Sequence, residues 1–212
     1  MLQKLKIKTL NDADLREAAI ALNALVFKDF LPDIIIGIKT GGYIVAEQMA
    51  REAAHKPLLL AVSMQRESTK KKAKLKNILR HFPYFITDKL RILEHRWLFR
   101  HCEKSQATKQ STVEQKSGLP RSLKSLAMTE TEDLRDVLRG RENAKILIVD
   151  DAVDSGRTLQ DVLFAVREAA DLSCEIRSAA ITLTTDFSII NPDYLLYKNV
   201  LCRFPWSFDF RG

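Results

Sequence analysis

Two neighbouring carboxylates and the polar stretch after them are the residues of this chain best suited to chemistry. Asp150 and Asp151 come first, and four residues of the stretch carry polar or charged side chains around one glycine: Asp154, Ser155, Gly156, Arg157 and Thr158. The glycine allows the backbone to approach a ligand closely, and a helix starting here would add its free amides. The stretch predicts a cup for one phosphate. Because like charges repel, the acidic pair must face sugar hydroxyls, a divalent cation or a cationic intermediate.

A strand and a helix must hold these residues in place. The continuous apolar run Ile146–Val149 precedes the acidic pair and is typical of a parallel strand covered on both faces. An amphipathic helix is predicted over residues 158–170. Open α/β sheets bind ligands beyond the carboxyl ends of their strands, so the chemistry is expected at this edge. A phosphate beside hydroxyls or metal suits a ribose 5-phosphate.

The segment Val149–Leu159, VDDAVDSGRTL, resembles the phosphoribosyl diphosphate (PRPP) motif of the type I phosphoribosyltransferases. The resemblance implies an α/β fold with a doubly wound parallel sheet. It also implies transfer of a 5-phosphoribosyl group from PRPP to a nitrogenous base with Mg²⁺ and release of pyrophosphate. It assigns Asp150 and Asp151 to the ribose hydroxyls and the metal, and residues 155–158 to the 5-phosphate. Asp154 would contact PRPP and act as the base on the nucleobase nitrogen, with a helix cap as its alternative role.

A second glycine-containing loop follows another predicted buried strand, residues 33–38. It consists of Lys39, Thr40, Gly41 and Gly42, and a helix is predicted over residues 43–54. Two glycines at a helix start allow close approach to an anion, although a glycine pair is also a common turn. The loop resembles the pyrophosphate loop of the same family, with Thr40 in the usual basic position and Lys39 one residue earlier. The family's cis peptide would fall between Thr40 and Gly41.

The C-terminal part, residues 184–212, resembles the hood of the xanthine/hypoxanthine/guanine branch through two short matches, Pro192-Asp193-Tyr194 and Phe204-Pro205-Trp206. An aromatic tail packed on the core is the alternative interpretation. The resemblance places the base beside Leu201 and Cys202, but Leu201 replaces the aromatic residue that stacks on the base. The lysine for a purine's exocyclic oxygen is replaced near Thr184 or Thr185. The acceptor is expected to be purine-like, with its identity open.

Composition predicts a single domain over residues 1–212, since 46% hydrophobic residues can form a sizeable core. No apolar run approaches the ~20 residues of a membrane span, and the start lacks a signal-peptide pattern, so a cytoplasmic protein without membrane contact is expected. Three distant cysteines predict reduced thiols. The net charge of +7 is concentrated: residues 61–124 contain 16 Lys and Arg against 5 Asp and Glu.

This basic segment, residues 63–125, is interpreted as an insertion. A helix is predicted over residues 87–102, with an apolar face formed by Ile86, Leu90, Leu93 and Trp97. A mobile loop, comparable in position with the family's catalytic loop, is predicted over residues 103–116. Other expected elements are a first helix capped by Asp12 or Asp14, strands at residues 58–62 and 178–183, and a helix with a capping box of Thr129 and Glu132 that ends near Arg139.

Two alternatives to an enzyme remain open. A regulator could sense PRPP or a nucleotide and bind nucleic acid through the lysine run Lys70–Lys76. A phosphoribosyltransferase-like scaffold could instead use the insert helix as a dimer interface, and a homodimer is expected in any case. The acidic pair and Asp154 favour the enzyme, because phosphate capture alone would not need them. A metal site built from the histidines of the insert is disfavoured, because no carboxylate completes the set.

Overall fold

The structure is a computed structural model that describes residues 5–63, 83–107 and 134–211. Five parallel strands form the main sheet in the order β3-β2-β4-β5-β6, and β1 and β7 form a separate parallel pair. The elements in chain order are β1 (Lys6–Thr9), α1 (Asp12–Val26), β2 (Ile34–Ile38), α2 (Gly41–Glu52), β3 (Leu58–Val62), α4 (Tyr84–Ala107), β4 (Lys145–Val153), α6 (Arg157–Ala169), β5 (Glu175–Leu183), β6 (Tyr194–Lys198) and β7 (Val200–Arg203). The predicted α/β class with a doubly wound parallel sheet is confirmed.

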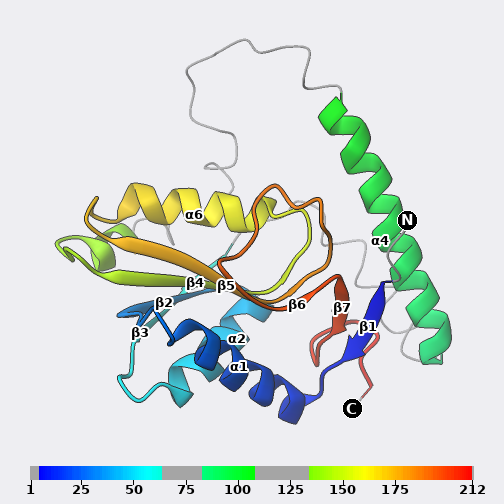
Figure 1. The fold of residues 1–212 in the computed structure, drawn as a ribbon, viewed down its shortest axis with the longest axis horizontal. Coiled ribbons are helices and arrows are strands. Elements are labelled where there is room, and N and C mark those ends of the chain that lie inside the picture. The colour runs from blue at the N-terminus through cyan, green and yellow to red at the C-terminus, as the bar shows by residue number, and fades with distance from the viewer. Residues whose placement is uncertain (1–4, 64–82, 108–133, 212) are drawn as a thin grey trace.

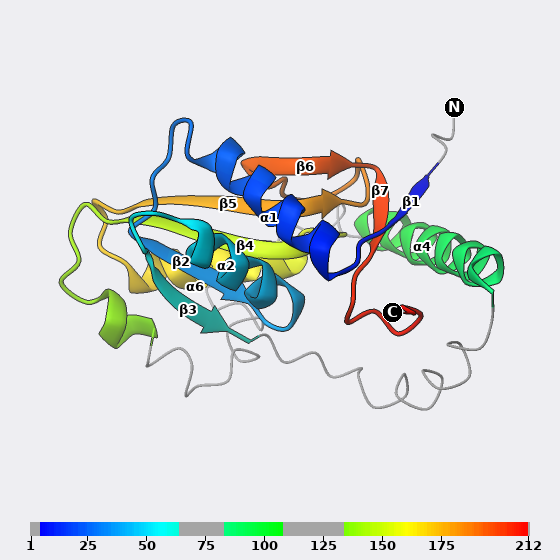
Figure 2. The ribbon, with the colours of Figure 1, turned by 90° about the horizontal axis from the view of Figure 1, so that it is seen from below.

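Helices cover both faces of the main sheet. α1 and α2 lie on one face and α6 on the other, together with a helical segment at residues 134–138 (Figures 1 and 2). Along β4, Leu147 and Val149 pack in the core beneath α1 and α2, whereas Ile146 and Ile148 pack in the core beneath α6. Because successive strand residues alternate between two buried faces, the strand needs an unbroken apolar run.

The cap of the first helix lies one residue before Asp12 and three residues before Asp14, the two predicted caps. Asn11 is the N-cap: its side-chain oxygen accepts a hydrogen bond of 2.9 Å from the Asp14 amide. The Asn11 backbone amide in turn donates a 3.0 Å hydrogen bond to the Asp14 carboxylate, which completes a capping box. The prediction of Asp12 or Asp14 as the cap was therefore wrong, although Asp14 takes part in the box.

The sequence did not predict the pair formed by β1 and β7. β1 joins the two ends of the chain, because Ile7 pairs with Leu201 and Lys8 with Cys202. The chain then turns into α1, and the Leu10 amide donates a 2.8 Å hydrogen bond to the Arg203 carbonyl. β1 is short and carries two lysines, so it has no apolar pattern of its own. β6, which also lies within residues 184–212, is the edge strand of the main sheet.

The insert helix α4 is longer than predicted, and its apolar face is not the face that packs on the domain. It spans 24 residues, so residues 103–107, predicted to be a mobile loop, are helical. Leu90 and Leu93, on the predicted apolar face, are 46% and 59% exposed. Buried Thr87 instead faces the rest of the protein, and Arg91 bonds to the C-terminal segment. The face of α4 that packs against the rest of the protein is therefore polar, because the side chains it contacts there are charged.

Figure 1 shows the first half of α4 beside β1 and β7, and its second half rising past the connection after β5. The lysine run Lys70–Lys76, the predicted loop residues 108–116 and the proposed box of Thr129 and Glu132 lie outside the described residues. Among the described helices, none is both long and apolar enough to cross a membrane.

Candidate active site

Two loops meet at the carboxyl edge of the sheet because β2 and β4 are adjacent parallel strands. The loop after β2 leads into Gly41 and Gly42, and both glycines touch β4. A Cβ on Gly41 would lie 2.2 Å from Asp151 Oδ2, and a Cβ on Gly42 would lie 2.6 Å from the Val149 carbonyl oxygen. A side chain at position 41 would displace the Asp151 carboxylate, and one at position 42 would collide with the backbone of β4. The predicted pyrophosphate loop and the acidic pair are therefore brought into direct contact.

The acidic pair lies within a strand, not after one. β4 runs on through both carboxylates to Val153, so the strand end predicted at Val149 was too early. Asp150 is 9% exposed, and its Oδ1 accepts a 3.0 Å hydrogen bond from the Asp151 amide. The regular pairing of Asp150 with Ala180 continues the ladder. This pairing fixes the backbone beneath the carboxylates.

Asp151 has a further partner from the C-terminal segment. Trp206 donates its indole N–H to Asp151 Oδ2 at 3.0 Å, and the indole stacks on Phe204 with ring centroids 4.9 Å apart and an interplanar angle of 2°. Burial raises the pKa of the Asp151 carboxyl, while hydrogen bonds from the Asp150 and Trp206 side chains lower it by less. The stacked ring gives the donor a fixed direction, so Asp151 is held between Gly41 and Trp206.

These carboxylates suit Mg²⁺. The ion prefers hard oxygen ligands and is commonly held by one or two carboxylates, with substrate phosphates and water completing its octahedron. Asp150 and Asp151 supply such oxygens beside a loop that can approach a pyrophosphate. Within the described residues, no cluster of three or more His, Cys, Asp or Glu side chains offers a complete protein cage. The donor set therefore fits a metal whose remaining ligands come from the substrate.

The phosphate loop has the shape expected of an anion site at a helix start. Gly156 has φ 78° and is the N-cap of α6, whose first amides follow at Arg157 and Thr158. Residues 188–190 cover the loop: a Cβ on Gly156 would lie 2.4 Å from Ser188 Oγ and 2.9 Å from the Ile190 carbonyl oxygen. The Ile189 amide also donates to the Ser155 carbonyl at 3.0 Å. A bulky residue at position 156 would disturb this cover as well as the phosphate cup.

Asp154 is not seen as a helix cap. The N-cap is Gly156, and it makes no side-chain capping bond. The Asp154 carboxylate instead accepts a 2.6 Å hydrogen bond from Thr184 Oγ1 at the end of β5. Burial lowers the pKa of the His95 imidazole on α4, and the Asp154 charge and the Thr184 backbone raise that pKa by less. Sequence reasoning did not connect His95 with Asp154, because His95 belongs to the insert.

The cis peptide lies between Lys39 and Thr40, so the prediction of Thr40–Gly41 was wrong by one bond. α2 begins at Gly41, two residues before the predicted helix start, and both glycines are helical. Only Lys39 and Thr40 are left to join strand to helix. Both residues are exposed at the site edge, and the Lys39 amide bonds to the Val62 carbonyl at 2.8 Å.

The residues predicted to flank the base lie in β7. Leu201 and Cys202 are 8% and 6% exposed, and burial raises the pKa of the Cys202 thiol to about 11, so the thiol is protonated at neutral pH. The Cys202 carbonyl accepts a 3.1 Å hydrogen bond from Arg91 Nη1 of α4. Contact of Leu201 and Cys202 with a base remains a prediction.

We expect Gly41→Ala to abolish binding of Mg²⁺–PRPP while the fold survives. The added methyl meets a carboxylate, which can rotate away, but that rotation breaks the placement of Asp151. Gly42→Ala is the matched variant, since its methyl meets the backbone of Val149 and Asp150 and should lower the melting temperature as well. Calorimetric titration with Mg²⁺–PRPP and thermal unfolding of both variants test this. Wild-type affinity in Gly41→Ala would contradict the convergence of the two loops.

Comparisons with known proteins agree with this geometry. A family model described as a phosphoribosyl transferase domain matches residues 7–184. A purine phosphoribosyltransferase from Pyrococcus horikoshii Ot3 has a similar structure, with 18% sequence identity and a TM-score of 0.55 over 98% of this chain and 96% of that chain. A Helicobacter pylori xanthine-guanine-hypoxanthine phosphoribosyltransferase gives 12% identity and a TM-score of 0.55 over 96% and 93%.

A hypothetical protein from Neisseria gonorrhoeae with bound ppGpp gives 14% identity and a TM-score of 0.52 over 96% of this chain and 91% of that chain. No curated protein sequence matches. At these identities the solved structures bear on the fold, while the family model covers most of the chain and includes both glycine loops and the acidic pair. The expected family is confirmed: this chain belongs to the phosphoribosyl transferase domain family and is an enzyme of the phosphoribosyltransferase class.

Proposed function

We propose that this enzyme transfers the 5-phosphoribosyl group of PRPP to a ring nitrogen of a purine-like base and releases pyrophosphate. The observation that carries the proposal is the convergence of three parts at one sheet edge. These parts are the loop Lys39–Gly42, the acidic pair, and the phosphate cup at the start of α6. Their order matches the three parts of PRPP: pyrophosphate, ribose hydroxyls and 5-phosphate.

Each part has a separate role in the reaction. Residues 155–158 bind the 5-phosphate through the α6 amides and the hydroxyls of Ser155 and Thr158. Asp150 and Asp151 orient the ribose hydroxyls, and their charge stabilises the positive ribose ring that develops as the bond from C1′ to pyrophosphate breaks. Lys39 and the amides of Thr40, Gly41 and Gly42 receive the leaving pyrophosphate. Mg²⁺, held by Asp150, Asp151 and substrate oxygens, would neutralise charge on that leaving group.

The acceptor enters on the side of Asp154. As the base nitrogen bonds to C1′, it loses its proton, and the Asp154 carboxylate receives that proton. Thr184 Oγ1 bonds to the same carboxylate at 2.6 Å and orients it. Leu201 and Cys202 would form an apolar wall of the base site. Similarity to the two structures named as purine enzymes supports a purine-like acceptor.

A panel of purine, pyrimidine and modified bases, incubated with PRPP and Mg²⁺, tests this function through the release of pyrophosphate. We expect base-dependent release with at least one purine-like base, and reactions without base correct for hydrolysis of PRPP. Binding of PRPP with no base-dependent release across the panel would overturn the proposal.

A regulator that senses PRPP or a nucleotide is the second candidate. Two observations favour it: the stacking aromatic is replaced by Leu201, and one structural neighbour was solved with bound ppGpp. In that case the basic insert would bind nucleic acid through its phosphates, with strong dependence on salt. Tight, sequence-selective RNA binding at physiological salt, without pyrophosphate release, would favour the regulator over the enzyme.

A homodimer is also part of the proposal. Three large apolar side chains of α4 are exposed: Phe85 by 64%, Leu90 by 46% and Leu93 by 59%. Exposed apolar side chains grouped on one helix are typical of a protein–protein interface. The molecular mass in solution is the direct measure of this state.

A further inference from the structure

The chain after β7 folds into a tight turn over residues 204–207. The Ser207 amide donates to the Phe204 carbonyl at 2.9 Å, and the Phe204 amide donates to Ser207 Oγ at 3.0 Å. Pro205 occupies the second position of this turn, where its fixed φ favours the reversal of the chain. Trp206 occupies the third position. The indole is therefore presented by a backbone that is bonded on both sides of it.

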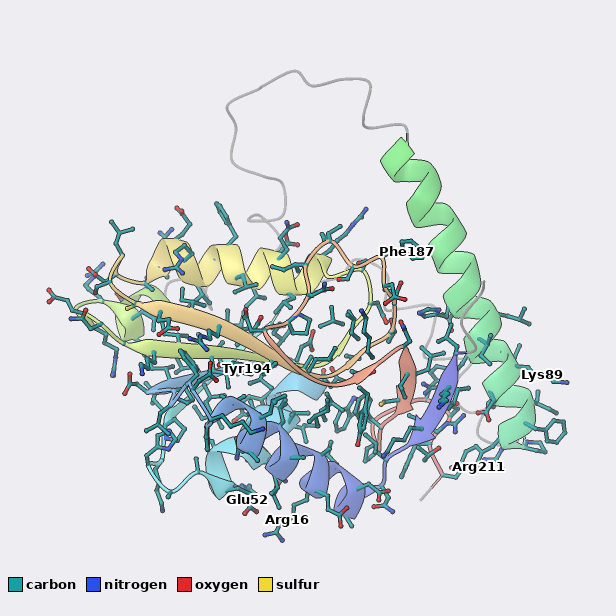
Figure 3. The ribbon with its side chains drawn as sticks, viewed as in Figure 1. Arg16, Glu52, Lys89, Phe187, Tyr194 and Arg211 are labelled. Carbon is teal, nitrogen blue, oxygen red and sulfur yellow. The ribbon has the colours of Figure 1, made fainter. Side chains whose placement is uncertain are left out.

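A buried ion pair closes the chain around the same turn. Arg203 precedes the turn and is 1% exposed, and Asp209 follows it and is 0% exposed. Arg203 Nε donates to Asp209 Oδ2 at 2.9 Å, and Arg91 Nε of α4 donates to the same oxygen at 2.8 Å. Figure 3 labels Arg211 near the end of this segment and Lys89 on the part of α4 beside it. The turn is thus anchored both to β7 and to α4.

The anchored turn directs the Trp206 indole at the acidic pair. Its N–H donates to Asp151 Oδ2 at 3.0 Å, while the half-buried ring stacks on Phe204 with an interplanar angle of 2°. The same carboxylate oxygen lies so close to Gly41 that a Cβ there would be 2.2 Å away. A rigid donor and a crowding backbone leave the carboxylate little freedom to rotate.

We propose that Trp206 is a positioning residue for Mg²⁺–PRPP, whose indole N–H holds the Asp151 carboxylate in the orientation that receives the metal and the ribose hydroxyls. This inference rests on the proposed function. Carboxylates that ligate a metal are themselves held by hydrogen bonds, and loss of such a partner typically costs about 10–100-fold in metal affinity or activity. Because Trp206 follows Leu201 and Cys202 closely, one stretch of chain would line the base site and orient this carboxylate.

Titration of PRPP with and without Mg²⁺ tests the positioning role. Trp206→Phe keeps an aromatic ring to stack on Phe204 but has no N–H to donate. In calorimetry, Mg²⁺ should raise the affinity of the wild type for PRPP, and Trp206→Phe should lose about 10–100-fold of that gain while its affinity for PRPP alone changes little. A merely structural role would weaken both titrations alike. Equal weakening, or an unchanged gain, would overturn the proposal.

An isosteric replacement removes the donor and nothing else. Trp97→Phe leaves Trp206 as the sole tryptophan of the chain and serves as the reference protein. Incorporation of benzothienylalanine into this reference replaces the indole N–H by sulfur and keeps the fused ring. We expect the same loss of the Mg²⁺-dependent gain as in Trp206→Phe, with a melting temperature close to that of the reference. A full gain would show that the shape of the ring suffices, and would also overturn the proposal.

Tryptophan fluorescence of the reference protein follows the contact without turnover. Its tryptophan emission comes from Trp206 alone, and the indole N–H is bonded to the carboxylate assigned to the metal. We expect the emission maximum to shift on titration with Mg²⁺–PRPP, with the same midpoint as in calorimetry. No shift at saturation would contradict the contact.

These measurements keep the inference and the proposed function apart. If the wild type releases pyrophosphate with a base and Trp206→Phe retains the full Mg²⁺-dependent gain, the positioning role fails and the transfer reaction stands. If that gain is lost in Trp206→Phe but no base supports release of pyrophosphate, the transfer reaction fails and the positioning role stands. A wild type that does not bind Mg²⁺–PRPP would overturn both.

Discussion

Asp151→Asn is expected to reduce transfer by about 10²–10³-fold without loss of thermal stability. Asparagine has nearly the same shape and can keep the 3.0 Å bond from Trp206, but it lacks the charge that stabilises the developing ribose cation. Loss of one preorganised electrostatic group in an active site typically costs this much. Steady-state kinetics with PRPP and the best base, together with thermal unfolding, measure both effects.

The stability side of this prediction follows from the pKa of Asp151. Burial raises that pKa, so the ionised carboxylate is less favourable in the folded protein than in the unfolded chain. Its contribution to stability is greatest below the unfolded pKa and is lost as pH rises through the folded value. At neutral pH the neutral amide should therefore match or exceed the wild-type melting temperature. The control is Asp171→Asn, because Asp171 is an exposed carboxyl that accepts a hydrogen bond from the Ser173 amide in a turn. This variant should leave kcat unchanged. Full activity in Asp151→Asn would refute the assigned role.

Asp209→Asn should cause the largest loss of stability, about 3–5 kcal/mol, because two buried or partly buried arginines would lose the charge they share. For a domain of this size that corresponds to a fall in melting temperature of about 6–20 °C. Loss of the Asp209 charge should also release Arg91 of α4, which bonds to the Cys202 carbonyl in the predicted base site, and so lower kcat. Denaturant and thermal unfolding measure the first effect, and transfer assays measure the second.

The same carboxyl predicts a dependence of stability on pH. Burial alone would raise the Asp209 pKa, but Arg91 and Arg203 lower it on balance. The stabilisation is present above the unfolded pKa of an Asp and is lost as pH falls through the depressed folded value, so Asp209→Asn should flatten the acid limb. Asp186→Asn is the control, because its 3.1 Å pair with Lys198 leaves both side chains about half exposed and should contribute much less to stability. Equal losses of stability in the two variants would contradict the role of Asp209 as a buried partner of Arg91 and Arg203.

The main sheet and the phosphate side of the site could be predicted from local sequence. Strands of a parallel sheet that is covered on both faces need an unbroken apolar run. β2, β3 and β4 each contain such a run, so the positions of these strands could be predicted from the sequence alone. The phosphate cup at Gly156 could also be predicted from local sequence. Its positive φ and the start of α6 depend on residues that are close together in the chain. The family resemblance rested on these segments.

Tertiary structure decided the acceptor side of the site. β1 pairs with a strand almost 200 residues away, and its sequence has no apolar pattern to show this. Trp206 reaches Asp151 across 55 positions, and Thr184 reaches Asp154 across 30. The sequence predicted an apolar face of α4 but not which face packs on the domain: Leu90 and Leu93 are exposed, and the opposite face meets buried charges on β7 and at Asp209. Periodicity records which residues share a face of a helix, but only the partner's charges and shape determine which face is buried.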